Sequence, residues 1–587
     1  MSSNRDPITI IEVDMDYCSL TFGTSPCTAA LSPKIDRKCF NSFYTCKDQE
    51  NYNKTTITYR FVEPRSKYPK TGTTFPCLIS VSTSSAQANI AGADDKLNSL
   101  GKRGKVTAEF SDFPYHDRFS DKYQAERISG DAEFNGVGYQ PIDRGTFWTK
   151  FKARNPNYTG RPFRKITGFI QDGVLTVEKT RHFVITNIIG PSDAGRVSIE
   201  AKDILKLADD DRAVAPKQSR GKLKEDISDA AGISFELNPS GIGSEYAASG
   251  MAVIGSEVVS FTRTGDTVTL TGRGQSLTKK SAHEIDDTFQ ETFSPRLARI
   301  DAVIYDLLIN YANIDPSFIT YSDWQDEVTR WAFTLNLTAD ITKPEGVSKL
   351  IGELASLGVT IWWDDATQKI NLRTNRPVDS EVVYSLSDRN NNIMASQEDR
   401  ADDRITEVIF NTVQIDPTKG VSETNFTRGN VIIAAVEKLP QAFGDTRIKK
   451  INSRWLNHGD DANVRILSLR MLDRFRLSPV RFVVVVDYRD DLSIGDVASL
   501  DSRIITNDTG ELQPTLAQVI MRQDEKEGNT VRLTLQTFPF DKRYGFITEN
   551  TRPLYSASSE AQKARGAYII DEVTLVFGDG GGGYRII

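Results

Sequence analysis

His182-Phe-Val-Ile-Thr-Asn-Ile-Ile189 and Arg196-Val-Ser-Ile-Glu-Ala201 are two β-strand patterns that follow one another across a short turn segment. Alternating apolar and polar side chains are typical of a strand with one buried face. Lys105–Phe110 and Thr56–Val62 show the same alternation upstream, and Gly145–Phe151 is interpreted as a further repeat of it. Several short strands at this density predict a β-barrel or sandwich domain over residues 51–215.

A second, smaller β region follows at residues 216–295. Its strand candidates are Ala252–Ile254, Glu257–Thr262 and Thr267–Thr271, and Gly265-Asp266 provides a plausible hairpin turn. Polar, serine-rich stretches flank these strands. The region is therefore predicted to be a small β module inserted between larger domains.

Residues 296–380 combine helices with a hairpin. Apolar residues between Arg299 and Ala312 recur at helical spacing, and a second helix is predicted from Val347 to Ala355, where Gly358 is its stop signal. The strand Val359–Trp363 then turns back into another strand, which predicts an α+β domain. Trp362 and Trp363 are adjacent on that strand and face opposite sides, so core packing is favoured over a sugar platform.

The remainder of the chain is again mostly β. Residues 381–545 carry several strand candidates and one helix at about 461–475, and residues 546–587 are predicted to be an extended tail with a flexible Gly-rich joint. The last residues of the tail are predicted to add a strand to a partner's sheet edge, or else to fray: Tyr584, Arg585, Ile586 and Ile587. The fold class is mainly β with α+β parts, in a multidomain chain.

Composition limits the class of protein. The chain has 587 residues, 39% of them hydrophobic, and a net charge of −7. This length predicts several domains. No apolar run approaches a membrane span and no basic stripe is evident, so neither stable membrane insertion nor tight DNA binding is expected. The first residues lack an apolar signal region, which predicts synthesis in a reducing cytoplasm.

Four of the five cysteines lie in the first 46 residues. Cys18, Cys27, Cys39 and Cys46 have the spacing Cys-x8-Cys-x11-Cys-x6-Cys, inside a segment, residues 1–50, that reads as mostly loop. Because such a segment has little apolar content, a metal would supply folding energy that burial cannot. A [4Fe–4S] cluster, a zinc ion, disulfides formed after release from the cell, and free thiols all remain open from spacing alone. Cys77 is predicted to be a buried apolar residue.

The cysteine segment resembles a known family. Asp14-Met-Asp-Tyr-Cys18-Ser-Leu-Thr-Phe-Gly-Thr-Ser-Pro-Cys27, with Lys38 to Tyr52, is similar to the opening of baseplate hub, or tail-tip, proteins of long-tailed (siphovirus-type) bacteriophages. The cysteine pairs are also similar to those of the phage lambda tail-tip protein, in which four thiolates hold an iron–sulfur cluster. There the spacer is longer and the segment lies towards the C-terminus. Arg154 to Arg161 and the 254–274 stretch fit the same family.

The resemblance implies a structural virion protein. Its members form a homotrimeric hub ring that closes the distal end of the tail tube and opens for genome ejection. The expected partners are the distal tail protein, the tape-measure protein and a central fibre or spike, and DNA passes through without specific binding. The four cysteines would then hold an iron–sulfur cluster, with zinc as the alternative, as a structural staple.

Two other classes of function find little support in the sequence. No G-x-S-x-G, P-loop or H-E-x-x-H motif appears, so no catalytic residue is predicted and the chain is not expected to be an enzyme. A cell-wall-degrading tail enzyme and a receptor-binding adhesin remain the alternatives. His182 lies in a strand pattern and is predicted to be packed or hydrogen-bonded rather than a ligand.

Overall fold

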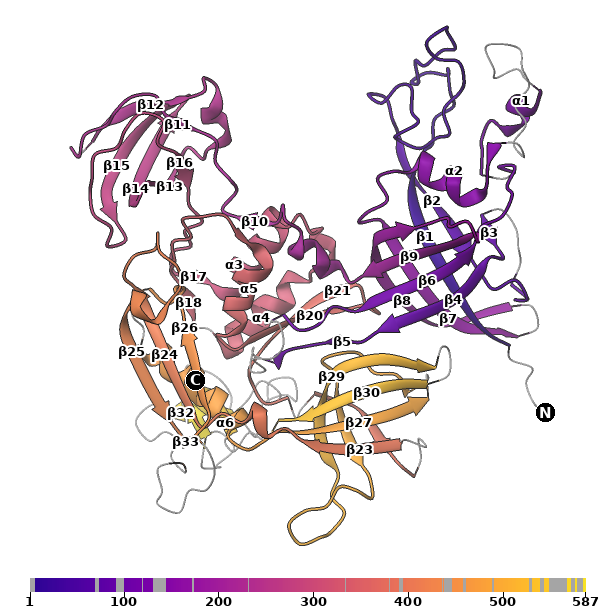
Figure 1. The fold of residues 1–587 in the computed structure, drawn as a ribbon. Coiled ribbons are helices and arrows are strands. Elements are labelled where there is room, and N and C mark those ends of the chain that lie inside the picture. Colours follow the sequence, from indigo (N-terminus) through magenta and orange to yellow (C-terminus); the bar gives the residue numbers. More distant parts are fainter. Residues whose placement is uncertain are drawn as a thin grey trace.

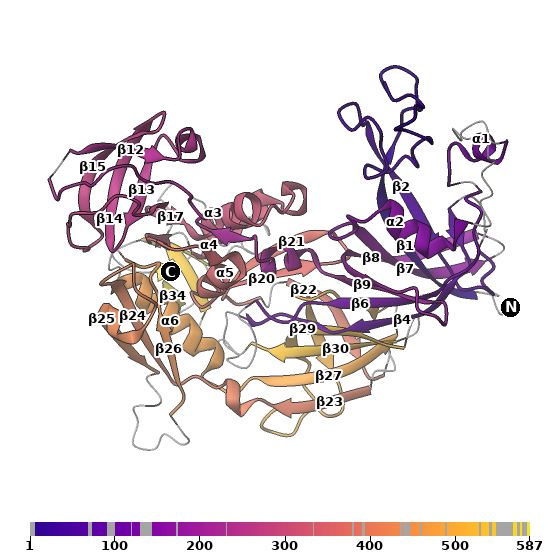
Figure 2. The same ribbon diagram turned by 45° about the horizontal axis from the view of Figure 1, so that its top comes forward.

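The protein is described by a computed structural model, which covers most of the chain (Figure 1). It describes residues 6–68, 73–90, 100–118, 120–129, 144–171, 174–230, 232–332, 334–378, 381–389, 394–434, 437, 446–457, 461–487, 490–526, 530–538, 543–547, 567–571, 576–577 and 584–586. The architecture is mainly β and multidomain, as the sequence predicts. Figures 1 and 2 both show a central helical region, with the N-terminal barrel on one side and a separate β module on the other.

The N-terminal barrel is an eight-stranded sheet in the order β3-β2-β1-β7-β8-β9-β6-β4. Its ends approach each other because the Leu78 N–H donates to the Val62 carbonyl at 3.0 Å, so the sheet is nearly closed. Aromatic side chains, including Phe61, Phe110 and Trp148, fill its interior. The predicted barrel is therefore confirmed. The strands are β1 (Asp6–Cys18), β2 (Lys54–Phe61), β3 (Thr74–Phe75), β4 (Leu78–Ser84), β6 (Lys105–Ser111), β7 (Pro162–Gln171), β8 (Val174–Ile189) and β9 (Arg196–Lys202).

The expectation that residues 1–50 are mostly loop is wrong for Asp6–Cys18. This stretch is β1, which lies between β2 and β7. Ile11, Val13 and Met15 point into the barrel core, and acidic residues alternate with them. The alternation was visible in the sequence, but its acidic half made the segment look polar.

The strand expected at Gly145–Phe151 is also wrong. Phe147–Arg154 is the helix α2, which packs against one end of the barrel. Phe147, Trp148 and Phe151 are all buried, and their spacing of one and four residues suits one helix face rather than alternate faces of a strand. The helix α1 (Gln124–Ser129) lies nearby.

The inserted module is a six-stranded antiparallel sheet in the order β11-β12-β15-β14-β13-β16. Thirteen buried residues, among them Phe235, Phe261 and Phe289, form its own hydrophobic core. The hairpin predicted at Gly265-Asp266 joins β14 to β15. The strands are β11 (Lys222–Leu223), β12 (Ser234–Asn238), β13 (Ser249–Ile254), β14 (Glu257–Thr264), β15 (Thr267–Gln275) and β16 (Phe289–Glu291).

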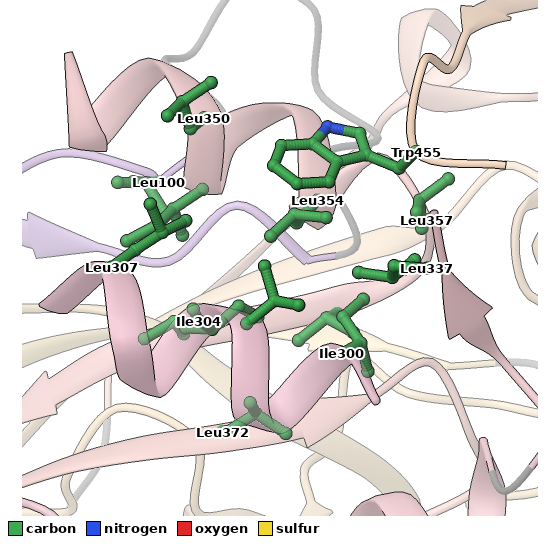
Figure 3. Close-up of a cluster of buried hydrophobic side chains, with 14 of the residues drawn as sticks. Leu100, Ile300, Ile304, Leu307, Leu337, Leu350, Leu354, Leu357, Leu372 and Trp455 are labelled. Carbon is green, nitrogen blue, oxygen red and sulfur yellow. The ribbon is translucent and has the colours of Figure 1, made fainter. Parts of the chain in front are cut away.

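The helical region holds the largest hydrophobic cluster. Figure 3 shows Leu350 and Leu354 of α5 (Val347–Ala355) facing Ile304 and Leu307, with Trp455 beside them. The predicted first helix is α3 (Ile300–Asp306), and it continues as a π-helical turn over Leu307–Tyr311. Helix α4 (Tyr321–Trp331) was not predicted. Strands β20 (Val359–Asp364) and β21 (Lys369–Thr374) form the predicted hairpin. The short strands here are β10 (Val214–Ala215), β17 (Ala298–Arg299), β18 (Asn336–Leu337) and β19 (Glu345–Gly346).

The C-terminal half forms a second curved sheet in the order β22-β28-β29-β30-β27-β23, and β5 (Ala86–Gln87) of the N-terminal part pairs with β29. Helix α6 spans Asp461–Phe475, as predicted. Strands β29 and β30, on either side of residues 527–529, pair antiparallel. The strands of this sheet are β22 (Val382–Ser387), β23 (Met394–Asp399), β27 (Val480–Asp487), β28 (Val497–Asp501), β29 (Thr515–Lys526) and β30 (Thr530–Thr537). Three further strands form a separate sheet in the order β25-β24-β26: β24 (Glu407–Gln414), β25 (Phe426–Ile433) and β26 (Ile448–Asn452).

Buried ion pairs join the two curved sheets. Lys165 Nζ of β7 lies 2.6 Å from the Asp524 carboxylate of β29, and both side chains are inaccessible to solvent. Arg181 of β8 binds Asp491, which also accepts two hydrogen bonds from Arg522. These cations hold the pKa of both Asp491 and Asp524 below the usual value, against the opposing effect of burial. The charges fix the angle between the sheets, because separating them would leave buried ions unpaired.

The chain ends in a small four-stranded sheet in the order β33-β32-β31-β34. Its strands are β31 (Arg543–Ile547), β32 (Ala567–Asp571), β33 (Val576–Phe577) and β34 (Tyr584–Ile586). The Gly-rich joint at 578–583 lies outside the described residues. No helix in the described part of the chain combines the length and apolarity needed to cross a lipid bilayer.

Candidate functional site

The cysteine segment rises from the end of β1, where Cys18 pairs across the ladder with Lys54 of β2. Figure 1 shows the loops after β1 extending beyond the end of the barrel. The strand below them is anchored by charge. Arg164 makes hydrogen bonds of 2.5 and 2.6 Å to Asp14 and one of 2.7 Å to Glu12, and Arg161 binds Asp16. These paired carboxylates fix the position of the end of β1, where Cys18 begins the cysteine segment.

Backbone hydrogen bonds bring the two cysteine pairs together. The Cys18 N–H donates to the Asn41 carbonyl at 2.7 Å, and the Asn41 amide returns a hydrogen bond of 3.1 Å to the Cys18 carbonyl. Asn41 has a φ of 58°, a left-handed conformation that Asn tolerates better than most residues. Thr28, next to Cys27, donates its N–H to Asp48 at 2.6 Å, and Asp48 lies two residues after Cys46. The loop therefore folds back on itself twice.

All four thiols are free, and Cys46 interacts electrostatically with each of the other three. Cys18 and Cys39 are buried, while Cys27 and Cys46 are half-buried. Burial raises the pKa of the Cys39 thiol, and the neighbouring Cys46 and Cys18 raise it further. Burial likewise raises the pKa of Cys46, to which Cys18 and Cys27 contribute. The four residues that the sequence singled out thus lie in one folded segment.

The four cysteines have the donor atoms of a thiolate-bound metal centre. Four cysteines match the ligand number and type of an iron–sulfur cluster or a structural zinc site. The Asp48 N–H also donates to Cys46 Sγ at 3.4 Å, the kind of hydrogen bond that tunes cluster sulfurs. Across the described residues, however, no three His, Cys, Asp or Glu side chains are close enough to share a metal ion. The donor chemistry fits, and ligation would require the thiols to move closer together.

Residues far away in the sequence support the segment. The hydroxyl of Tyr123 accepts a hydrogen bond from the Phe22 N–H, and Arg127 Nη2 donates to the Cys39 carbonyl at 2.5 Å. Arg127 is itself held by Asp121 at 2.8 Å, with both side chains buried. Sequence reasoning missed these contacts because about a hundred residues separate the partners and no local pattern links them.

The apolar support of the segment is small. Phe22, Ala29, Cys39 and Tyr123 form its buried hydrophobic cluster, and two of the neighbouring side chains, Phe43 and Tyr44, are 45% and 62% exposed. A cluster of this size contributes little burial energy compared with the cost of ordering some thirty loop residues. The local chemistry therefore favours an added cross-link.

The predicted partner-binding end, Tyr584–Ile586, is the edge strand β34. It pairs in parallel with β31 of the same chain, so Tyr584 lies opposite Arg543. Ile587 lies outside the described residues. The addition of this strand to a partner's sheet stays a prediction.

Three lesser expectations are confirmed. Cys77 is buried in the barrel core. The Gln368 amide lies 2.7 Å from a ring nitrogen of His182, whose pKa is lowered by burial. Trp362 and Trp363 are both buried, and Trp363 Nε1 donates to the His182 carbonyl at 3.1 Å.

Comparisons with known proteins add structural likenesses only. No protein-family model matches the chain, and no curated protein matches its sequence. The tail protein from Neisseria meningitidis MC58 is 13% identical, and the alignment covers 65% of this chain and 89% of that one, with a TM-score of 0.31. The prophage MuSo2 43 kDa tail protein from Shewanella oneidensis is 8% identical over 78% of this chain and 97% of that one, with a TM-score of 0.32. No functional residue is carried over from alignments at these TM-scores.

Proposed function

We propose that this protein is a structural hub at the distal end of a long-tailed phage tail. It forms a ring that closes the tail tube, links the tube to a central fibre or spike, and opens for DNA ejection. The observation that carries the proposal is the cysteine segment. Four thiols, whose spacing within each pair is similar to that of tail-tip proteins, lie in one folded segment on the end of a barrel strand that paired charges hold in place.

In this proposal Cys18, Cys27, Cys39 and Cys46 ligate a [4Fe–4S] cluster, with zinc as the less favoured alternative. The bound group supplies a cross-link between the two turns of the segment and no redox step. Such a cross-link is favoured energetically, because the segment has only a small apolar cluster of its own. Arg127 and Tyr123 hold the base of the segment from outside.

The proposed assembly is a homotrimer around the tail axis. Its partners are the distal tail protein, the tape-measure protein and the central fibre or spike, which the edge strand β34 would meet. No side chain is assigned a catalytic role, and DNA passes without specific binding. Receptor engagement would open the ring through contacts that differ between its closed and open states.

Electron microscopy of virions carrying a tag on this chain tests the proposal. We expect threefold density at the tail tip and none on the tube or capsid. Density elsewhere on the particle would overturn the assignment. A peptidoglycan-degradation assay on the purified chain separates the hub from a cell-wall enzyme, since the hub predicts no turnover, and binding of the isolated chain to host cells would favour an adhesin.

A further inference from the structure

A basic cavity adjoins the cysteine segment, and nothing in the proposed hub role requires it. Its volume is about 610 Å³, which lies in the range of small-molecule sites. Seven of its thirteen described lining residues are Lys or Arg, in a chain whose net charge is −7. No carboxylate lies among these described lining residues. The lining therefore carries cations and no anion, although Asp117, Asp121 and Glu126 behind it pair with four of those cations.

Three separate parts of the chain build the cavity. The cysteine segment contributes Arg37, Lys38 and Lys47, helix α1 contributes Arg127, and one face of α2 contributes Lys150 with Arg154 one turn later. The cations of α2 are held in place from behind. Arg154 makes hydrogen bonds of 2.6 and 2.9 Å to the fully buried Asp117, which also pairs with Lys150 at 3.3 Å.

The wall is rigid at its centre. The ring of Phe40 lies between two guanidinium groups, at 4.2 Å from Arg127 and 3.9 Å from Arg154. Stacking of this kind fixes the planes of both groups. Their positions are thus set before any ligand arrives, which lowers the ordering cost of binding.

The rim has a different character. Tyr44 is 62% exposed, and Arg37 and Lys47 are exposed beside it. An exposed aromatic ring next to cations suits a ligand that carries both a sugar face and an anionic group. A long nucleic-acid strand would instead need a continuous basic track, and this is a confined cavity.

We propose that this cavity binds a phosphorylated saccharide, with the phosphate among the guanidinium and ammonium groups and the sugar ring against Tyr44. Arginine and lysine are both suited to the phosphate, because a cationic N–H group donates strong hydrogen bonds to anionic oxygens. This site does not depend on the place of the chain in a virion, but it needs a folded cysteine segment, because Arg37, Tyr44 and Lys47 belong to that segment.

Calorimetric titration of the full-length protein tests this site, with glucose 6-phosphate, glucose and inorganic pyrophosphate as probes. We expect glucose 6-phosphate to bind, glucose not to bind, and binding to weaken as salt is raised. Pyrophosphate binding as tight as that of glucose 6-phosphate would show a bare anion site and overturn the saccharide assignment. A 12-base single strand of DNA that binds at least tenfold tighter would also overturn it.

The matched variants are two charge reversals of equal size. Arg37→Glu with Lys47→Glu changes the exposed rim and should weaken glucose 6-phosphate binding at least tenfold. Lys279→Glu with Lys280→Glu makes the same charge change on the inserted module and should leave binding within twofold. Tyr44→Ala should weaken glucose 6-phosphate binding but not pyrophosphate binding. An equal loss of glucose 6-phosphate affinity in both double variants would mean that binding depends only on net charge. That result would contradict the proposed site. Thermal unfolding verifies that each variant is folded.

Discussion

The cysteine segment and the inserted module both project from the body of the protein, yet they are stabilised in opposite ways. The module encloses thirteen buried apolar residues between its strands. The cysteine segment has a cluster of four, one of them Tyr123 from outside and one of them Cys39 itself. A β module of this size can fold by burial, whereas a polar loop segment needs a cross-link. The cysteines thus lie in the region where burial contributes least to folding.

The largest expected effect comes from removing one thiol of the segment. Cys39→Ser should abolish metal binding and unfold most of residues 19–50, because a structural metal centre contributes on the order of 10 kcal/mol. Hydrogen exchange should rise throughout the segment and stay unchanged in residues 216–295 and 296–380, and tails carrying the variant should fail to assemble. Normal assembly and infection by such tails would show that the segment is not stapled.

The second prediction concerns a substitution in the core of the inserted module. Phe261 is buried in the module core and packs edge-on against Phe289 at 5.1 Å. Phe261→Ala should cost about 3–5 kcal/mol and raise exchange in the module alone. Iron content should be unchanged, since the two regions have separate cores. A loss of iron in this variant would mean that the regions are coupled.

Acid should destabilise the inserted module through one buried carboxylate. Glu257 is buried in the module, and although burial opposes its ionisation, hydrogen bonds from Arg273 and His283 lower its pKa from 4.5 to about 2. A carboxylate with a lowered pKa stabilises the fold fully above pH 4.5 and loses this contribution as the pH falls towards 2. The module should therefore melt progressively earlier over that interval.

The Glu257→Gln variant checks the cause of this acid dependence. It should lower stability at pH 7 by about 1.5–3 kcal/mol and flatten the dependence between pH 4.5 and 2. Thermal unfolding monitored at several pH values measures both effects. An unchanged slope in the variant would assign the acid sensitivity to another group.

The smallest effect is expected at Tyr123, which supports the cysteine segment through its hydroxyl. If a metal centre carries most of the stability, Tyr123→Phe should cost only about 1 kcal/mol and leave the metal content intact. Loss of the metal or of exchange protection across the whole segment would show that protein contacts, and not the thiols, hold it.

Local sequence patterns predicted local structure well. Helix α6 and the β20–β21 hairpin were predictable because apolar spacing and turn residues specify them within a short window. Strand β1 was missed because its outward residues, such as Asp14, are acidic and meet their arginine partners only across the sheet. Helix α2 was misassigned because aromatic residues suit both strands and helix faces.

The candidate site likewise depends on contacts between distant residues, which the sequence does not reveal. Its four cysteines were evident from composition, since they are concentrated in a chain otherwise poor in cysteine. Their proximity was not evident, because it depends on Asn41 bonding back to Cys18. The basic cavity was invisible to sequence reasoning, because its cations come from residues as far apart as Arg37 and Arg154 and meet only in the fold.

The metal content of the protein purified without oxygen tests the central claim most directly. A brown protein with broad visible absorbance and about four irons per chain is the predicted result. A colourless protein that holds one zinc per chain, or no metal at all while the segment stays protected from exchange, would contradict it.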